Sequence, residues 1–428
     1  MTSMHSTDTI GGVSNVSDNP NPINPIRVLH FADIHIGMEN FGRIDPATGV
    51  NQRVLDFIIR LEEIVNYALE HEADLVIFAG DAFKTRDPNT TYQREFARQI
   101  MRLSRANVPT VLLVGNHDMP LMDKRASSVD IFATLDVPNI YVGRKEQLLK
   151  IETKRGLVQV GTAPWPQRSR LMALDEHRGL NIEQLDQALE QQVTAELQRL
   201  ASDVDMAYPA LLTGHFSVSG ATFGSERLVM IGRDSIIKLS ELTQSAWDYV
   251  ALGHIHKHQD VNTGNYPAVV YSGSLERIDF GEEQEDKGFC WIELRRGQTT
   301  WQFVRLKVRP FVTIQVDATQ DGDTPTEAVL RAIERHDVSD AIVRVRVKLL
   351  QSQESLLKSK EIEQALSTAH MVAGIGKDVQ REVRSRLGVQ NAESLPPEDL
   401  LRRYFLSKNI ASDRIDALDV LAREIMND

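Results

Sequence analysis

The fold is decided first at residues 26–37, which read IRVLHFADIHIG. An apolar, β-rich run fills the first half of this stretch, and a polar cluster that contains Asp33 and His35 follows it. The same arrangement recurs at residues 73–81, ADLVIFAGD, and at residues 109–118, PTVLLVGNHD. Short apolar runs of this kind are typical of strands that are buried on both faces of a sheet.

The segments between these three runs carry the period of a helix. Apolar residues recur there at helical spacing in two groups: Leu55, Ile58, Ile59, Ile64, Ala68 and Leu69, and then Tyr92, Phe96, Ile100 and Leu103. The succession of strand, helix, strand, helix and strand predicts a parallel sheet with crossover helices. Because ligands gather at the carboxyl ends of such strands, we expect the polar clusters to meet at one edge.

A second sheet is predicted from about residue 148 onward. Its expected elements are hairpin strands at 148–151 and 157–161, a helix at 182–200, and strands at 210–213, 249–252, 269–271, 288–294 and 301–306. Two of these strands run into further polar clusters, which contain His215, His254 and His256. We interpret this part as a largely antiparallel sheet that packs on the first one.

The two ends of the chain differ from this centre. Residues 1–25 hold no aromatic residue and no Lys or Arg, so we expect a disordered tail. A boundary near residue 310 is expected to divide a main domain, residues 26–310, from a small β-α-β module at residues 311–350, with an extension to about residue 390 left open. Residues 391–428 are expected to form a pair of C-terminal helices.

The module and the terminal helices each carry one informative pattern. Residues 324–327 read TPTE, which predicts a capping box with proline at the first helical position. Arg344, Arg346 and Lys348 form one face of the last strand, which is either solvated or in contact with phosphate. The amphipathic helices expected at 397–408 and 412–426 either dock on another chain or pack on their own domain.

Composition narrows the class of protein. The 428 residues are 42% hydrophobic and 25% charged, which excludes a wholly disordered or fibrous chain. Neither a membrane-spanning apolar run nor a secretory leader is recognisable, so we expect a cytoplasmic protein without membrane contact. The single cysteine, Cys290, excludes an intrachain disulfide, and its apolar neighbours predict a buried thiol. The net charge of −12 means that a polyanionic substrate needs a local attractor.

The five polar clusters together predict a metal centre. They supply eight side chains: Asp33, His35, Asp81, Asn116, His117, His215, His254 and His256. A single histidine near a strand end is usually structural, but the combination is specific. Imidazole and carboxylate without thiolate suit manganese, iron or zinc. The number of ligands exceeds the need of one ion, so we expect two metals that share a bridging carboxylate and hold a phosphoryl group.

These motifs, taken in order, resemble those of the calcineurin-like metallophosphoesterases over residues 26 to about 310. The resemblance implies a two-sheet αββα sandwich. It also implies that Asp81 bridges two divalent ions. One ion would be bound by Asp33, His35, Asp81 and His256, and the other by Asp81, Asn116, His215 and His254.

Three further residues are assigned by the same resemblance. His117 corresponds to the histidine that protonates the leaving oxygen or stabilises the developing charge, and Asp118 beside it is expected to orient the ring. Lys84 stands where some members have a histidine that steers the substrate phosphate. Lysine keeps a cation at this position but cannot relay a proton. The role of Lys84 in substrate binding therefore stays open.

Within this superfamily the chain is most similar to the bacterial SbcD nucleases of DNA double-strand-break repair. The similarity lies in residues 29–37, 214–221, 253–257 and 271–277. It implies a DNA substrate, manganese as the metal, and cleavage as an exonuclease on duplex ends and an endonuclease on single strands. It also implies a homodimer associated with the nucleoid, in which Arg277 either contacts phosphate or forms a structural salt bridge.

The same similarity assigns the C-terminal parts. The module after residue 310 resembles the capping domain of that family, and the terminal helices resemble the element that docks on the coiled coil of the SbcC-type ABC ATPase. ATP would be used by that partner. The alternative is a small-nucleotide phosphodiesterase or phosphoprotein phosphatase of the same fold, for which the additional domain and helices are unnecessary. A non-catalytic scaffold would be expected to have broken ligand motifs, and none is broken.

Overall fold

The computed structural model describes residues 24–120, 125–168, 171, 181–224, 236–380, 396–408 and 410–427. Nearly all of the tail expected at residues 1–25 lies outside these residues. The described chain divides into two compact units, of which the first comprises residues up to Val312 together with Asp340–Ile342. The second comprises Thr313–Ser339 and the chain from Val343 onward.

The first sheet has the strand order β14-β13-β1-β2-β3-β4. Its strands are β1 (Ile26–Phe31), β2 (Leu75–Phe78), β3 (Thr110–Leu113), β4 (Ile140–Gly143), β13 (Gly288–Leu294) and β14 (Thr300–Arg305). The first four are mutually parallel, as the alternation of strands and helices predicts. The other two are antiparallel additions, because β13 pairs with β1 and β14 pairs with β13.

Helices α1 (Gln52–Glu70) and α2 (Thr90–Arg105) cover the outer face of this sheet, and the short α3 (Asp130–Thr134) precedes β4. Each long helix begins at an asparagine, Asn51 or Asn89, whose side chain accepts a hydrogen bond from a backbone N–H of the first turn. Their apolar stripes pack on the alternate sheet residues that point outward, such as Leu29 and Val76.

The second sheet has the order β11-β12-β10-β7-β6-β5. Its strands are β5 (Gln147–Thr153), β6 (Gly156–Ala163), β7 (Ala210–His215), β10 (Tyr249–Gly253), β11 (Gln259–Asp260) and β12 (Ala268–Tyr271). The prediction of a largely antiparallel sheet was wrong, because β6, β7, β10 and β12 are parallel. Long connections return the chain to the same end, and α5 (Ile182–Ser202) packs on the outer face. The antiparallel strands expected at 288–294 and 301–306 belong to the first sheet.

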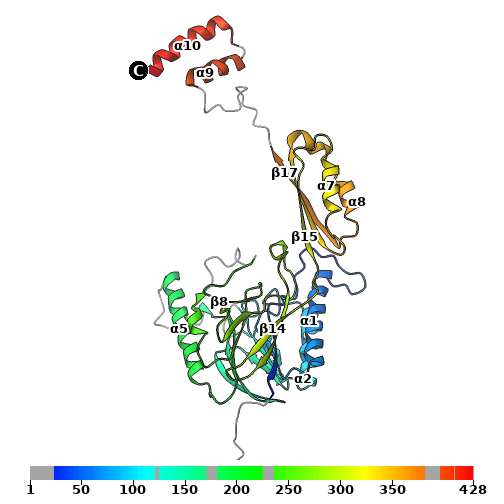
Figure 1. Ribbon diagram of the computed structural model, residues 1–428, viewed down its shortest axis with the longest axis vertical. Coiled ribbons are helices and arrows are strands. Elements are labelled where there is room, and N and C mark those ends of the chain that lie inside the picture. The colour runs from blue at the N-terminus through cyan, green and yellow to red at the C-terminus, as the bar shows by residue number, and fades with distance from the viewer. Residues whose placement is uncertain are drawn as a thin grey trace, which may run out of the picture. The chain divides into compact units, whose positions relative to one another are not determined.

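The two sheets pack face to face, so the first unit is an αββα sandwich. Side chains that point inward from both sheets form one apolar layer, which includes Val28, Ile77, Leu211, Ala251 and the buried thiol of Cys290. Figure 1 shows α1 and α2 on one flank of this unit and α5 on the other, with the strands between them. The fold class predicted from the sequence is confirmed. Two-residue strands β8 (Ser217–Val218) and β9 (Ile236–Ile237) and the single turns η2 (Leu239–Glu241) and η3 (Phe280–Glu282) complete the unit.

One polar contact crosses this apolar layer. The ring of His30 on β1 accepts a hydrogen bond at Nδ1 from the hydroxyl of Tyr249 (3.3 Å) and donates one from Nε2 to the carbonyl of Leu252 (3.2 Å), both on β10. Complete burial lowers the pKa of His30 to about 3, so the ring is neutral. The contact connects the two strands whose ends carry Asp33 and His254.

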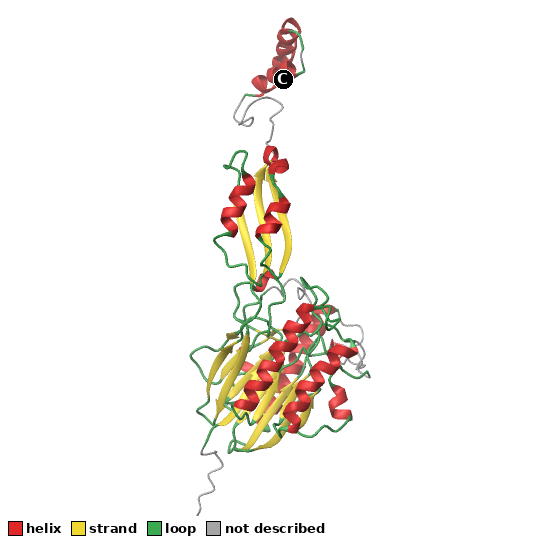
Figure 2. Ribbon diagram, turned by 90° about the vertical axis from the view of Figure 1, so that its right-hand side faces the viewer, coloured by secondary structure: helices red, strands yellow, loops and turns green. Residues whose placement is uncertain are grey.

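The second unit contains a three-stranded sheet of β15 (Phe311–Asp317), β16 (Ile342–Leu350) and β17 (Met371–Gln380), with helices α7 (Pro325–Ile333) and α8 (Ser359–Ala365) and the turn η4 (Gln351–Leu356). Figure 2 shows its helices against the strands. The capping box predicted at Thr324 does not form, since the side chain of Thr324 accepts no hydrogen bond from the first turn of α7; its hydroxyl donates to the carbonyl of Asp321. On the cationic face of β16, Arg344 donates to Thr313 and Lys348 pairs with Asp317.

The C-terminal helices are α9 (Pro397–Ser407) and α10 (Ser412–Asn427). They contact one another, and Arg402 on α9 forms ion pairs with Asp416 and Asp419 on α10. Several large apolar side chains of the pair are exposed, namely Tyr404, Leu406, Val420, Leu421 and Ile425. In the part of the chain that the structure describes, no helix is both long enough and apolar enough to cross a membrane.

Candidate active site

Five strands of the first unit end at the same edge of the sandwich, and the predicted polar clusters lie there. From the first sheet, β1 leads to Asp33 and His35, β2 to Asp81, and β3 to Asn116 and His117. From the second sheet, β7 ends at His215, and β10 leads to His254 and His256. Parallel strands in both sheets therefore bring residues that are far apart in the sequence to a single site.

Direct contacts connect these side chains. Nε2 of His35 lies 3.0 Å from Nε2 of His256. Oδ1 of Asn116 lies 3.0 Å from Nε2 of His215 and 3.2 Å from Nδ1 of His254. These contacts define two groups of donors, one around His35 and one around Asn116.

Asp81 joins the two groups. Its Oδ2 lies 3.7 Å from Nε2 of His35 and 3.4 Å from Nε2 of His215. Its Oδ1 accepts a hydrogen bond from the backbone N–H of His117 at 2.8 Å. Asp33 is held by a different contact, because both of its oxygens accept a hydrogen bond from the backbone N–H of His254, at 2.9 and 3.0 Å.

The backbone at the site is locally strained. Asp33, His35, Asp81 and His254 all have positive φ angles, of 51°, 51°, 63° and 94°. Non-glycine residues seldom adopt this region, and such residues concentrate at functional sites. The backbone N–H of Asp33 bonds to the carbonyl of Gly80 at 3.0 Å and that of His35 to the carbonyl of Asp81 at 3.1 Å. These bonds hold the loops after β1 and β2 in the strained conformation.

Gly80 permits this close approach. Its φ is +101°, and a side chain on it would collide with the ring of His215 and the backbone of Gly115. Only glycine satisfies both requirements. The glycine that precedes Asp81 is therefore part of how the site is built.

Three histidines have their outer ring nitrogen fixed by a second partner. Nδ1 of His215 donates to the carbonyl of Ala79 at 2.7 Å, Nδ1 of His256 to Oε1 of Glu282 at 3.0 Å, and Nδ1 of His117 to the carbonyl of Lys84 at 2.6 Å. Since carbonyl and carboxylate oxygens only accept, the proton of each neutral ring lies on Nδ1. In each case a neutral ring would present the lone pair of Nε2 to the site, the arrangement found for histidines that bind metals.

The residues fit divalent metal ions. Three groups bring three ligand atoms within 4.8 Å of one another: Asp33, His35 and His256; Asp33, Asp81 and His215; and His35, Asp81 and His117. Neighbouring ligands of an ion at about 2.1 Å lie about 3 Å apart, which matches the short His35–His256 contact. The donors are imidazole and carboxylate with one amide, so the set is suited to manganese, iron or zinc.

Burial and neighbouring charges shift the pKa values of Asp33 and Asp81 in opposite directions. Burial raises the pKa of Asp33 above its usual range, although His215 and His256 oppose this. For Asp81 burial acts in the same direction, but His215 and His117 outweigh it and hold its pKa well below the usual range. Asp81 therefore stays ionised, which suits a carboxylate that would bridge two cations.

Asp118 does not orient His117 as the sequence analysis expects. Its carboxylate accepts hydrogen bonds from the backbone N–H groups of Asp81 (2.8 Å), Ala82 (3.0 Å) and Gly115 (3.1 Å). The ring of His117 is held instead by the Lys84 carbonyl. Asp118 consequently positions the loop of Asp81 rather than the ring of His117.

Arg277 and Lys84 differ in their surroundings. The guanidinium of Arg277 donates to the backbone carbonyls of Glu282 (3.1 Å), Arg309 (3.2 Å) and Glu285 (3.0 Å). Arg277 therefore connects these loops. The ammonium group of Lys84 forms no hydrogen bond or ion pair with the residues that the structure describes. It lines a pocket next to the site.

Two buried charged residues that support the site carry no recognisable motif. Glu282 bonds to the ring of His256 and forms an ion pair with Lys287 at 2.9 Å. Lys287 in turn donates to the backbone carbonyl of His256 at 3.1 Å. Trp165 is a third unpredicted neighbour, since its ring lies 4.8 Å from that of His254. No spacing pattern in the sequence relates these residues to the ligands.

Comparison with known proteins finds a phosphoesterase family and relatives named as nucleases. The model of the calcineurin-like phosphoesterases matches residues 26–258. The chain is 26% identical over 295 residues to SbcD of the SbcCD nuclease of Bacillus subtilis, a match that covers 66% of this chain and 70% of that protein. It is 28% identical over 280 residues to SbcD of the SbcCD nuclease of Escherichia coli, covering 64% and 66%.

A third relative is matched over more of its length. The "DNA double-strand break repair protein Mre11" of Thermoplasma acidophilum is 22% identical over 387 residues, which cover 88% of each chain. Two solved structures are also similar to part of the chain. TT1561 of Thermus thermophilus has 16% identity and a TM-score of 0.35, covering 66% of this chain and 100% of that one. A dimetal phosphatase from Danio rerio has 12% identity and a TM-score of 0.38, covering 65% and 96%.

Proposed function

The chain belongs to the calcineurin-like phosphoesterase family, and from this premise we propose that it is a nuclease that hydrolyses DNA phosphodiesters with two divalent metal ions. One observation carries the proposal. Asp81 lies between two groups of donors, within 3.7 Å of His35 and 3.4 Å of His215. A carboxylate shared in this way is what a two-metal phosphoesterase requires.

The ligands divide between the two ions according to their contacts. Asp33, His35, Asp81 and His256 would hold one ion, as the meeting of His35 and His256 supports. Asp81, Asn116, His215 and His254 would hold the other, as the two contacts of Asn116 support. When bound, the ions supply Lewis acidity toward the phosphate and the attacking water. We propose manganese for both positions, as the resemblance to the SbcD nucleases implies, and a donor set without thiolate is compatible with this metal.

The protein itself provides the proton for the leaving group. Nδ1 of His117 is held by the Lys84 carbonyl, so Nε2 is the nitrogen that exchanges a proton with the substrate. The ring lies edge-on to that of His35, with 4.8 Å between their centroids. A histidine held in this way is suited to act as the general acid that protonates a leaving alkoxide.

The C-terminal parts of the chain are proposed to cap the nuclease domain and to bind a partner. We assign residues 311–350, extended through β17, to a capping domain and the α9–α10 pair to the docking of an SbcC-type ABC ATPase, which would couple cleavage to ATP. The exposed apolar residues of the pair support this role. The complex would contain a homodimer of this chain, cut duplex ends as an exonuclease and single strands as an endonuclease, and act in DNA repair on the cytoplasmic nucleoid.

Cleavage of defined DNA tests the proposal. The full-length chain with manganese is expected to degrade linear duplex and single-stranded DNA, and an ATPase of the SbcC type is expected to add ATP dependence. Asp81→Asn should abolish cleavage together with binding of the two ions. Hydrolysis of small phosphate esters alone, without cleavage of either DNA, would instead show a small-nucleotide phosphodiesterase or a phosphatase.

A further inference from the structure

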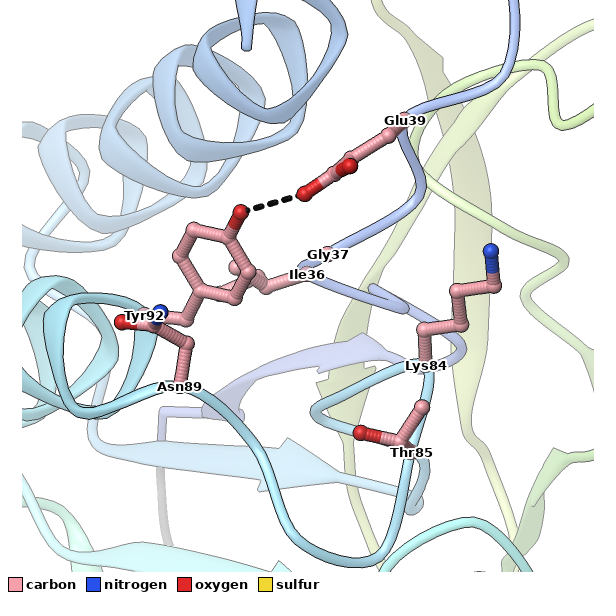
Figure 3. A pocket seen from close by; sticks show the side chains of 7 residues that line it. All are labelled: Ile36, Gly37, Glu39, Lys84, Thr85, Asn89 and Tyr92. Atoms are coloured by element: carbon pink, nitrogen blue, oxygen red, sulfur yellow. Dashed lines mark hydrogen bonds between the residues drawn. The ribbon is translucent and has the colours of Figure 1, made fainter. Parts of the chain in front are cut away.

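A pocket of about 290 Å³ adjoins the proposed catalytic centre on the side of His117. Lys84 connects the two, because its backbone carbonyl holds the ring of His117 at 2.6 Å while its side chain lines the pocket. The pocket also begins one residue beyond His35, at Ile36. Figure 3 shows it between the loops that follow β1 and β2 and the first turn of α2.

One wall of the pocket consists of an aromatic ring with a carboxylate beside it. The ring of Tyr92 packs on Gly37, where a side chain would lie 3.3 Å from the ring and where φ is +107°, so only glycine fits. The Tyr92 hydroxyl donates to Oε1 of Glu39 at 2.7 Å. The second carboxylate oxygen of Glu39 has no hydrogen-bond partner among the described residues. This wall offers an aromatic ring and a free hydrogen-bond acceptor.

The opposite wall is cationic and polar. Figure 3 shows Lys84 and Thr85 across the pocket from Tyr92, with the ammonium group of Lys84 free of contacts to the other residues drawn. A single cation, an aromatic ring and a carboxylate acceptor form the combination that binds one phosphate, the face of one base and an amino or imino N–H of that base. The volume lies near the lower end of the range for small-ligand sites and suits one nucleoside rather than a base pair.

We propose that this pocket binds the nucleoside on the leaving side of the scissile phosphate, with its base against Tyr92 and Glu39 and a backbone phosphate of the same strand at Lys84. This assignment rests on the proposed function. The side follows from His117, because the residue that protonates the leaving oxygen must face the leaving nucleoside. Since the pocket holds one base, that nucleoside must be unpaired when it binds, as in other enzymes that take a base out of the stack.

A single-stranded oligonucleotide with one cleavable phosphate and phosphorothioates elsewhere tests the proposal. An abasic unit replaces the nucleoside on either side of the cleavable bond, and the fragment that ends in a free hydroxyl identifies the leaving side. With the full-length chain and manganese, removal of the leaving-side base should slow cleavage about tenfold, since stacking on one aromatic ring is lost. Tyr92→Ala should remove this sensitivity, whereas Tyr92→Phe, which keeps the ring, should retain it.

The outcomes separate this proposal from the one on which it rests. If the wild-type chain cleaves the oligonucleotide but the leaving-side base has no effect, or has the same effect in Tyr92→Ala, the pocket does not bind that base and the nuclease function still stands. If the wild-type chain cleaves no DNA, both proposals fail.

A second measurement keeps the proposal testable if Tyr92→Ala does not fold. Lys84→Met should lower the slope of log Kd against log salt concentration for the oligonucleotide by about 0.7, the value for one lost phosphate contact with a single strand. An unchanged slope would contradict phosphate binding at Lys84.

Discussion

Glu282 accepts a hydrogen bond from Nδ1 of His256 at 3.0 Å, and its other oxygen forms an ion pair with Lys287 at 2.9 Å. Both charged side chains are completely buried. Since Lys287 also donates to the backbone carbonyl of His256, the pair holds this residue by its ring and by its main chain. A carboxylate behind a histidine fixes the tautomer of the ring and raises its basicity. Glu282 would therefore strengthen the binding of a metal ion by His256 without contacting the ion itself.

Replacement of Glu282 should therefore weaken metal binding. Glu282→Gln keeps the shape of the side chain but removes its charge, and we expect about a 10- to 100-fold loss of metal affinity. Equilibrium dialysis against manganese measures this directly, without reference to activity. Glu293→Gln, at an exposed position of β13, is the matched control. Equal affinity of the two variants would show that the contact is structural only.

The sequence predicts that the polar clusters lie close together because each of them follows a strand. Asp33, Asp81 and Asn116 each come shortly after a buried strand, and parallel strands place all their carboxyl ends at one edge. Glu282 could not be found in this way. It lies in a single helical turn, 26 residues beyond His256, and only the return of the chain brings it behind that ring. The partner of His117 was missed for a related reason, because a backbone carbonyl carries no sequence signal.

The limits of the fold prediction have similar causes. The apolar pattern located β7 and β10 correctly. For a strand that is buried on both faces, however, this pattern does not indicate whether the neighbouring strands are parallel or antiparallel to it. The antiparallel interpretation of the second sheet therefore failed. Strand β17 was not expected, since Gly374 and Gly376 disfavour strands and half of its residues are exposed. It forms because β16 offers an edge with which it can pair.

His117→Asn should separate catalysis from metal binding. Loss of the proton donor is expected to slow cleavage of DNA about 10²- to 10⁴-fold, because an alkoxide leaves poorly without a proton. Hydrolysis of bis-p-nitrophenyl phosphate should suffer less, since p-nitrophenolate leaves without one. Metal content by atomic absorption should stay the same as in the wild type. Loss of an ion would instead make His117 a ligand, as its place in one of the three candidate groups allows.

Asp118→Asn should destabilise the loop of Asp81. Both oxygens of Asp118 accept backbone N–H groups, and the amide nitrogen of asparagine would face a donor at one of these positions. A buried unsatisfied donor costs about 1–3 kcal/mol of the free energy of unfolding. Urea denaturation of the metal-free protein measures this loss. Ser128→Ala removes only the hydroxyl that donates to Asp118 and should have a smaller effect.

An acid-sensitive contribution to stability is expected from Asp56. This carboxylate on α1 pairs with Arg53 at 2.6 Å and with Arg309 at 2.7 Å. Burial would raise its pKa, but Arg309 and Arg53 together lower it below the usual value of 3.8. A lowered pKa stabilises the fold above pH 3.8, and this stability is lost as the pH falls through the lower value of the folded state.

Asp56→Asn should consequently lower the free energy of unfolding by about 3 kcal/mol at pH 7, because Arg53 and Arg309 each lose one of their partners. The difference from the wild type should shrink as the pH falls below 3.8, where the wild-type carboxyl also becomes neutral. Chemical denaturation at a series of pH values tests both statements. A difference that stays constant down to about pH 2, well below the usual carboxyl range, would mean that the ion pairs contribute little.

The α9–α10 pair gives the last prediction. Leu421 and Ile425 on α10 are 54% and 72% exposed, so their replacement by glutamate should leave the melting temperature nearly unchanged. A partner that buries them would have to desolvate two charges, which costs several kcal/mol of binding. Co-purification with an SbcC-type ATPase should then be lost, while manganese-dependent cleavage of DNA by the chain alone should persist. Ile182→Glu, at a 70% exposed position of α5, is the matched control and should retain the partner. If the double variant also retains it, the helices do not form the docking site.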